Sequence, residues 1–145
     1  MVHFQTKRNK LVGMYYRPDN SDVQYDMSWV LDTPFAKTFE TLANQKDSEA
    51  ATAFWKLAYS IARADTWKRV GVGAWTVEYA GHLVLCENDP ETGTVSSRVL
   101  RENPNATLPA WSIADAAVLA YYYRRHKHTQ RAAETSKRQQ KLRRR

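Results

Sequence analysis

Several features that would place this chain among secreted or membrane proteins are missing from its sequence. It has one cysteine, Cys86, among 145 residues, so it can form no disulfide within the chain. This excludes the small disulfide-stapled scaffolds of secreted proteins and suits a reducing compartment. The first residues, MVHFQTKRNKLVG, lack the apolar core of a signal peptide, and no stretch approaches the roughly 18 to 20 apolar residues of a membrane span. We therefore expect an intracellular protein, cytoplasmic or within a virion, that is neither secreted nor membrane-spanning.

Acidic residues are almost missing from the C-terminal segment. Residues 124–145 hold ten Lys or Arg and a single acid, Glu134, for a net charge of +9. Residues 1–123 hold twelve Lys or Arg and fourteen acids, for a net charge of −2. The overall charge of +7 thus comes from the C-terminal segment, which we call the basic arm. A localised basic block is typical of a protein that binds a polyanion, most often nucleic acid.

The basic arm predicts binding to the phosphate backbone of DNA or RNA. Lys and Arg side chains neutralise phosphates and release counterions, so the affinity should fall steeply with salt concentration. Nothing in the arm is typical of base recognition, and we therefore expect little sequence specificity. The expected phosphate-binding residues are Arg124, Arg125, Lys127, Arg131, Lys137, Arg138, Lys141, Arg143, Arg144 and Arg145. Lys7, Arg8 and Lys10 form a second, smaller basic patch that could assist them.

Proline and glycine are both missing from Ala110 to the C-terminus, so neither residue interrupts a helix there. One helix could run from Ser112 to Arg145, on the order of 50 Å at 1.5 Å per residue. Its first half, Trp111–Tyr123, is apolar on all sides and must be buried, either in the body of the protein or against another copy. We therefore divide the chain into a compact body, residues 1–123, and the basic arm, which continues the last helix or is disordered.

Upstream of that helix, the hydrophobic pattern changes between the periods of strands and helices. Leu11–Tyr16 and Val23–Leu31 have the apolar patterns of strands. Thr33–Pro34 is typical of a helix start, and a second helix from Glu49 to about Trp67 would complete a helical hairpin. Three strands within Val70–Leu100 then predict an antiparallel meander. The expected fold class is α+β: a helical hairpin packed on a small antiparallel sheet of three to four strands, with a long C-terminal helix that ends in the basic arm.

A second interpretation makes the chain a structural subunit of a virion or another oligomeric particle. In that case Trp111, Tyr121, Tyr122 and Tyr123 lie at interfaces between copies of the chain. The basic arm then reaches a packaged genome or an acidic protein neighbour. The five tryptophans of the chain are compatible with packed interfaces, because aromatic residues are enriched there.

A third interpretation is a small ribonuclease or other nuclease, because Glu78, His82 and Arg98 lie close together in the sequence. A Glu or His could act as a base while an Arg binds the phosphate. No full set of nucleophile, base and orienting group emerges, so we expect a protein without catalytic residues. We also expect no cofactor and no metal site, because His82 and Cys86 offer two ligands where a metal site needs three or four.

Overall fold

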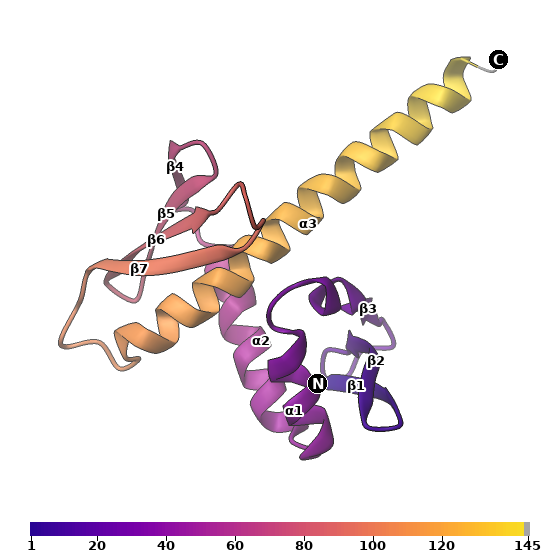
Figure 1. The fold of residues 1–145 in the computed structure, drawn as a ribbon, viewed down its shortest axis with the longest axis horizontal. Coiled ribbons are helices and arrows are strands. Elements are labelled where there is room, and N and C mark those ends of the chain that lie inside the picture. The colour runs from indigo at the N-terminus through magenta and orange to yellow at the C-terminus, as the bar shows by residue number, and fades with distance from the viewer. Residues whose placement is uncertain (144–145) are drawn as a thin grey trace.

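The computed structural model describes the backbone of residues 1–143 and the side chains of residues 1–130. In chain order the elements are β1 (Val2–Lys7), β2 (Lys10–Tyr16), β3 (Tyr25–Asp26), the 3-10 helix η1 (Ser28–Asp32), α1 (Ala36–Asn44), α2 (Ser48–Ala62), β4 (Lys68–Gly71), β5 (Ala74–Tyr79), β6 (His82–Asn88), β7 (Val95–Arg101) and α3 (Ala110–Arg143). The strands form two antiparallel sheets, of order β1-β2-β3 and β4-β5-β6-β7. Figure 1 shows these sheets on opposite sides of the region where α2 and α3 cross. The predicted α+β class is confirmed, and within residues 1–143 no helix is long and apolar enough to cross a membrane.

The N-terminal sheet is a hairpin with a short third strand. β1 and β2 are joined by a two-residue turn, Arg8–Asn9, in which both residues have positive φ, 53° and 63°. The sequence pattern predicted β2 but not β1, because most residues of β1 are polar. Two side chains of α2 hold this strand at Val2: the Thr52 hydroxyl accepts from its N–H at 2.9 Å, and the Ser48 hydroxyl donates to its carbonyl.

The strand predicted over Val23–Leu31 is wrong. Only Tyr25–Asp26 pairs with β2, and the chain then forms η1. The Asp26 carboxylate accepts hydrogen bonds from the backbone N–H and the hydroxyl of Ser28, at 3.0 and 2.7 Å, and this local turn competes with the strand. The period-two pattern was misleading because a 3-10 turn repeats every three residues, which places Met27 and Val30 together in the core.

The helical hairpin is confirmed, although α2 ends earlier than predicted. Asp47 caps α2, and its carboxylate accepts from the N–H of Ala50 at 3.0 Å. We expected α2 to reach Trp67, but it ends at Ala62. The indole of Trp67 folds back instead, and its Nε1–H donates to the carbonyl of Ile61 at 2.9 Å. This side chain therefore covers the end of α2.

The predicted three-stranded meander is confirmed as β5, β6 and β7, and β4 extends it to four strands. A two-residue turn, Ala80–Gly81, joins β5 to β6 with φ values of 52° and 81°. Val77, Val84 and Val99 are aligned across three strands, and this row packs into the core. The residues that alternate with this row, among them Glu78 and Arg98, therefore lie on the outer face of the sheet, away from the core.

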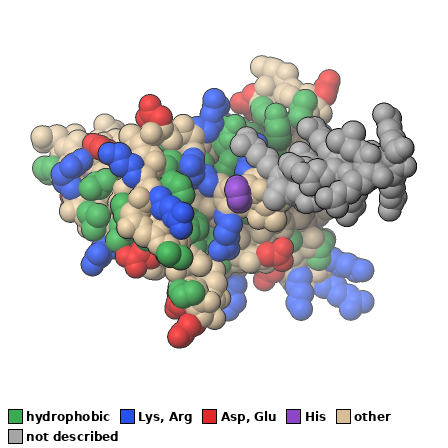
Figure 2. Space-filling model, turned by 90° about the horizontal axis from the view of Figure 1, so that it is seen from above, with side chains coloured by type: hydrophobic (Ala, Val, Ile, Leu, Met, Phe, Trp, Pro, Cys, Tyr) green, Lys and Arg blue, Asp and Glu red, His purple; other side chains and the backbone are tan. Residues whose placement is uncertain are grey.

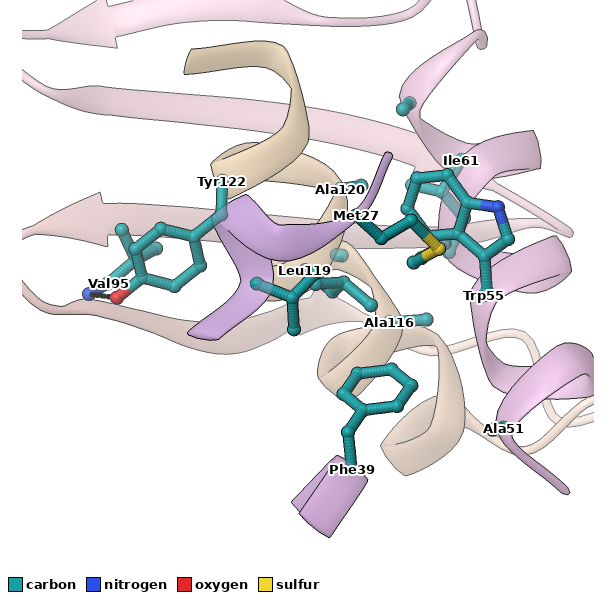
Figure 3. Close-up of a cluster of buried hydrophobic side chains, with 14 of the residues drawn as sticks. Met27, Phe39, Ala51, Trp55, Ile61, Val95, Ala116, Leu119, Ala120 and Tyr122 are labelled. Carbon is teal, nitrogen blue, oxygen red and sulfur yellow. Dashed lines mark hydrogen bonds between the residues drawn. The ribbon is translucent and has the colours of Figure 1, made fainter. Parts of the chain in front are cut away.

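α3 lies at the centre of the core, between α2 and the four-stranded sheet. Figure 3 shows its side chains Ala116, Leu119, Ala120 and Tyr122 among residues from α1, α2 and β7. Small alanine side chains on α3, together with Ala51 and Ala58 of α2, are fully buried and let the two helices pack closely. The apolar half of α3 is thus buried within this chain, with the exception of Trp111 at its start, which is 73% exposed.

One buried hydrogen bond joins α3 to the start of β7. The hydroxyl oxygen of Tyr122 accepts from the N–H of Val95 at 2.8 Å (Figure 3). We predict that Tyr122→Phe lowers the free energy of unfolding by about 1–2 kcal/mol, because it leaves this N–H without an acceptor. Urea denaturation measures the difference. Tyr25→Phe is the matched control, since Tyr25 is 55% exposed and should lose less than about 0.5 kcal/mol. Equal stability of the two variants would contradict the prediction.

Candidate nucleic-acid interface at the root of the basic arm

The basic arm leaves the body as a direct continuation of α3. The helix is unbroken from Ala110 to Arg143, and its yellow end extends away from both sheets in Figure 1. Of the predicted phosphate-binding residues, the structure describes the side chains of Arg124, Arg125 and Lys127. The others, Arg131, Lys137, Arg138, Lys141, Arg143, Arg144 and Arg145, lie outside the residues with described side chains. The described geometry therefore concerns the place where the arm joins the body.

An open pocket of about 450 Å³ lies at this junction. Four of its residues on α3, Tyr121, Arg124, Arg125 and His128, follow the spacing i, i+3, i+4, i+7 and so share one helix face. The pocket, which we call the root pocket, is lined by Trp67, Arg69, Trp75, Tyr121, Arg124, Arg125 and His128. The face shown in Figure 2 carries Lys and Arg side chains among hydrophobic ones, with a histidine beside the grey atoms.

The sheet wall of the root pocket is built by a cross-strand pair. Arg69 of β4 lies opposite Trp75 of β5, so the two side chains stand on the same face of the sheet. Trp67 immediately precedes β4, and its hydrogen bond to Ile61 fixes the indole against the end of α2. Trp67 and Trp75 are both partly exposed, so part of each indole remains accessible beside a guanidinium group.

Arg124 connects three parts of the body. Its Nη1 donates to the carbonyl of Ala62 at 2.8 Å, at the C-terminal end of α2, where a cation is favoured by the helix dipole. Its guanidinium carbon lies 4.8 Å from the ring centre of Trp67 and 6.0 Å from that of Trp75. Partial burial lowers the pKa of Arg124, but an arginine keeps its charge in a protein. Arg124 therefore supplies positive charge to the root pocket while it fixes the start of the arm.

Tyr121 and Arg125 of α3 also bind one end of the four-stranded sheet, where the β4–β5 turn lies beside the last residue of β6. The hydroxyl of Tyr121 donates to the carbonyl of Gly73 at 2.9 Å. Arg125 lies 4.8 Å from the ring centre of Tyr122 and contacts the side-chain oxygen of Asn88 at 3.4 Å. These contacts hold the helix face of the pocket at a fixed distance from its sheet wall.

On another side of the helix, the arm is anchored by an aromatic cluster. The ring of His126 stacks on Trp29 at a centroid distance of 5.3 Å, and Tyr123 lies 5.3 Å from Trp55. Burial lowers the pKa of His126, Lys127 lowers it further, and Asp26 opposes both. Contacts with the body thus extend to at least His126, three residues beyond the boundary that we predicted from charge.

Among its described residues, the root pocket is lined by positive and aromatic side chains and by no negative one. Its lining contains three arginines, a histidine, two tryptophans and a tyrosine. No Asp or Glu is among these described residues, so no lining carboxylate repels an approaching anion. A second open hollow, of about 560 Å³, shares Arg124 and His128 and adds Arg63 and Lys127 on the α2 side. Cations and aromatic rings therefore surround the root of the arm on both of these sides.

The second basic patch lies elsewhere in the fold. Lys7, Arg8 and Lys10 cluster around the β1–β2 turn, where with Val12 they line a shallow hollow of about 550 Å³. Figure 1 shows this turn well separated from the basic arm. The patch and the root pocket are therefore distinct positive surfaces on the body.

The structure does not bring the three nuclease candidates together. His82 is fully buried: its Nε2–H donates to the carbonyl of Leu108 at 3.0 Å, and its Nδ1 accepts from the N–H of Asn103 at 2.9 Å. Glu78 lies on the outer face of the sheet, in an ion pair with Arg101 at 2.9 Å. Arg98 is also exposed on that outer face. His82 thus fastens the segment between β7 and α3, while the other two side chains lie on the opposite face of the sheet.

The remaining candidate residues, apart from Trp111, are buried or partly buried in the body. Cys86 is buried and lies in the row of Trp75, and the part of the chain with described side chains holds no group of three His, Cys, Asp or Glu suited to a metal ion. Tyr122 is 3% exposed, and Tyr121 and Tyr123 are partly buried against the chain's own body. Trp111 alone of the predicted interface residues is largely exposed.

Sequence reasoning missed four residues of the root pocket: Trp67, Arg69, Trp75 and His128. The spacing of Tyr121, Arg124, Arg125 and His128 was visible as a helix face, but its partner surface depends on the β4–β5 pairing. No family model matches the chain, and comparison with curated proteins and with solved structures finds no significant similarity. The function must therefore be inferred from the site itself.

The buried thiol gives a direct test of the core beside the pocket. Burial raises the pKa of Cys86 from 9.0 to about 12. A group with a raised pKa stays protonated below it, so the reactive thiolate is about one thousandth of the population at pH 9. We predict that native protein does not react with a thiol reagent between pH 7 and 9, whereas protein unfolded in urea reacts fully. Rapid labelling of native protein, measured by mass spectrometry, would contradict this.

Proposed function

We propose that the protein is a non-enzymatic nucleic-acid-binding protein that grips phosphates through the basic arm, with little sequence specificity. The observation that carries this proposal is the separation of charge: +9 in residues 124–145 against −2 in residues 1–123. Because a polyanion is attracted to the arm and weakly repelled by the body, the complex should form along the arm.

The shape of α3 supports this proposal. Beyond the root pocket, the backbone of α3 extends away from both sheets as far as Arg143 (Figure 1), so a long ligand could lie along it. At the root of the arm, Arg69 of the body adds to the positive surface of Arg124 and Arg125, with no carboxylate among the described residues of the pocket lining. Phosphate contacts of this kind position a nucleic acid without reading its sequence.

The experiment compares two full-length variants that lose the same charge. In the arm variant, Lys137, Arg138, Lys141 and Arg143 become Gln. In the control variant, the exposed body residues Arg17, Lys37, Lys46 and Lys56 become Gln. We predict that the arm variant binds a fluorescent DNA or RNA duplex more weakly and that its dependence on salt decreases. Each lost phosphate contact should reduce the slope of log K against log salt by about 0.9 for duplex DNA.

Fluorescence anisotropy between about 50 and 200 mM salt measures both quantities. The control variant should keep the slope of the unmodified protein, because its cations lie outside the arm. Equal losses in the two variants would indicate binding through net charge alone and contradict the assignment to the arm. A protein that binds neither DNA nor RNA at the lowest salt concentration would refute the proposed function.

One observation favours the alternative of a structural subunit in a virion or other oligomeric particle. The indole of Trp111 is 73% exposed at the start of α3, beside Leu108, which is 37% exposed. Exposed aromatic side chains are enriched at protein interfaces. We predict for this alternative that the protein forms defined oligomers by light scattering and that Trp111→Ser dissociates them. A monomer at high concentration, with and without nucleic acid, would refute it.

A further inference from the structure

We propose that the root pocket binds one unpaired nucleotide of a single-stranded nucleic acid. The base would stack on the aromatic wall of the pocket, formed by Trp67 and Trp75, and Arg69 and Arg125 would hold the phosphate. This inference rests on the proposed function and specifies its ligand. The basic arm alone would bind any polyanion, whereas the root pocket would favour a strand whose bases are exposed.

The aromatic wall provides a stacking surface that is already ordered. Trp67 is fixed by its hydrogen bond to Ile61, and Trp75 is fixed within β5. The guanidinium of Arg124 lies over the ring of Trp67, at 4.8 Å from its centre, and farther from the ring of Trp75, at 6.0 Å, so the surfaces offered to a base are the indole of Trp75 and the outer side of this guanidinium. Bases stack on both indole rings and guanidinium groups, so the wall presents matched faces to an unpaired base.

The cations stand where the phosphate of a stacked nucleotide would lie. Arg69 is exposed and is the cross-strand partner of Trp75, which places a guanidinium next to that indole. One of its five N–H donors, at Nε, is directed to the carbonyl of Gly71 at 3.3 Å. Arg125 closes the other side from α3, where Asn88 and Tyr122 hold its side chain. A phosphate between Arg69 and Arg125 would be attracted by a positive charge from each side.

The dimensions of the pocket suit a single nucleotide. Its volume of about 450 Å³ lies within the range of small-molecule sites, roughly 300–1,000 Å³. A base inside a duplex is covered on both faces by its neighbours and cannot stack on a protein side chain unless it leaves the helix. The pocket should therefore discriminate against duplexes. It should not discriminate strongly among the four bases, because every base has a stacking face.

The position of the pocket also agrees with an extended strand. α3 carries the basic arm directly away from the pocket, so a strand seated in the pocket can continue along the arm (Figure 1). The arm would then hold successive phosphates, while the pocket holds the base of one nucleotide. Affinity would thus come from the arm, and preference for single strands would come from the adjacent root pocket.

The experiment compares three fluorescent 12-nucleotide probes that share a phosphate backbone chemistry. The first is a single strand of mixed sequence, the second is the corresponding duplex, and the third is an abasic single strand. Full-length protein is titrated with each probe by anisotropy at one salt concentration. We expect the normal single strand to bind about tenfold more tightly than the abasic strand, because only the first has a base to stack.

Variants then assign this difference to the root pocket. Trp75→Leu should remove most of the tenfold difference, and Trp111→Leu, which changes an exposed tryptophan outside the pocket, should keep it. Arg69→Gln on the exposed strand β4 is the second variant if Trp75→Leu does not fold. It should weaken both single strands by several-fold, because it removes a phosphate contact.

The outcomes separate this inference from the proposed function. If the three probes bind equally well, the arm acts alone, and the pocket assignment is refuted while the proposed function stands. If the preference for bases survives Trp75→Leu, or if Arg69→Gln weakens neither single strand, the nucleotide is bound elsewhere and the assignment is again refuted. If no probe binds at the lowest salt concentration, the proposed function and this inference both fail.

Discussion

The packing of α3 between α2 and the four-stranded sheet is the contact on which the rest of the structure depends. The two sheets belong to different parts of the chain, and the first half of α3 lies between the helical hairpin and the second sheet. Alanines let α2 approach α3 closely, while Leu119 and Tyr122 fill the wider spaces (Figure 3). Small side chains on one face and large ones on the other are the ordinary means of packing such layers to high density. Loss of this contact would separate the chain into two parts that could not each bury a sufficient core.

The same helix decides the electrostatics of the molecule. Residues up to Tyr123 are committed to the core, and residues from Arg124 carry the positive charge. At the boundary, side chains serve both purposes: Arg124 bonds to the end of α2 and stacks on Trp67, and Arg125 bonds to Asn88. The root pocket arises because these cations are held against tryptophans by the fold. A disordered basic tail would have the charge without the aromatic surface.

The sequence predicted the elements whose signals are local. The helical hairpin, the antiparallel meander and the lack of helix breakers after Ala110 are each marked by short-range patterns, and the structure contains the hairpin, the meander and the unbroken last helix. Pairing over long distances was harder to predict. β1 is polar in sequence and becomes a strand through β2 and α2, and the Val23–Leu31 pattern gave way to a turn made by Asp26. The arginines and tyrosines of α3 were visible as candidates. Their meeting with Arg69 and Trp75 was not, because it requires the register of β4 on β5.

The unbroken course of α3 has a consequence for the thermodynamics of binding. A flexible tail must lose conformational entropy when it settles on a ligand, and this loss weakens the complex. In this protein the backbone of the arm is already helical from the body to Arg143, and folding of the core has set the direction in which it leaves. In the proposed complex, the ligand would meet a backbone that is already helical, so less conformational entropy would be lost on binding. The buried residues that hold α3 in place would in this way contribute to affinity, in addition to the contacts proposed for the root pocket and the arm.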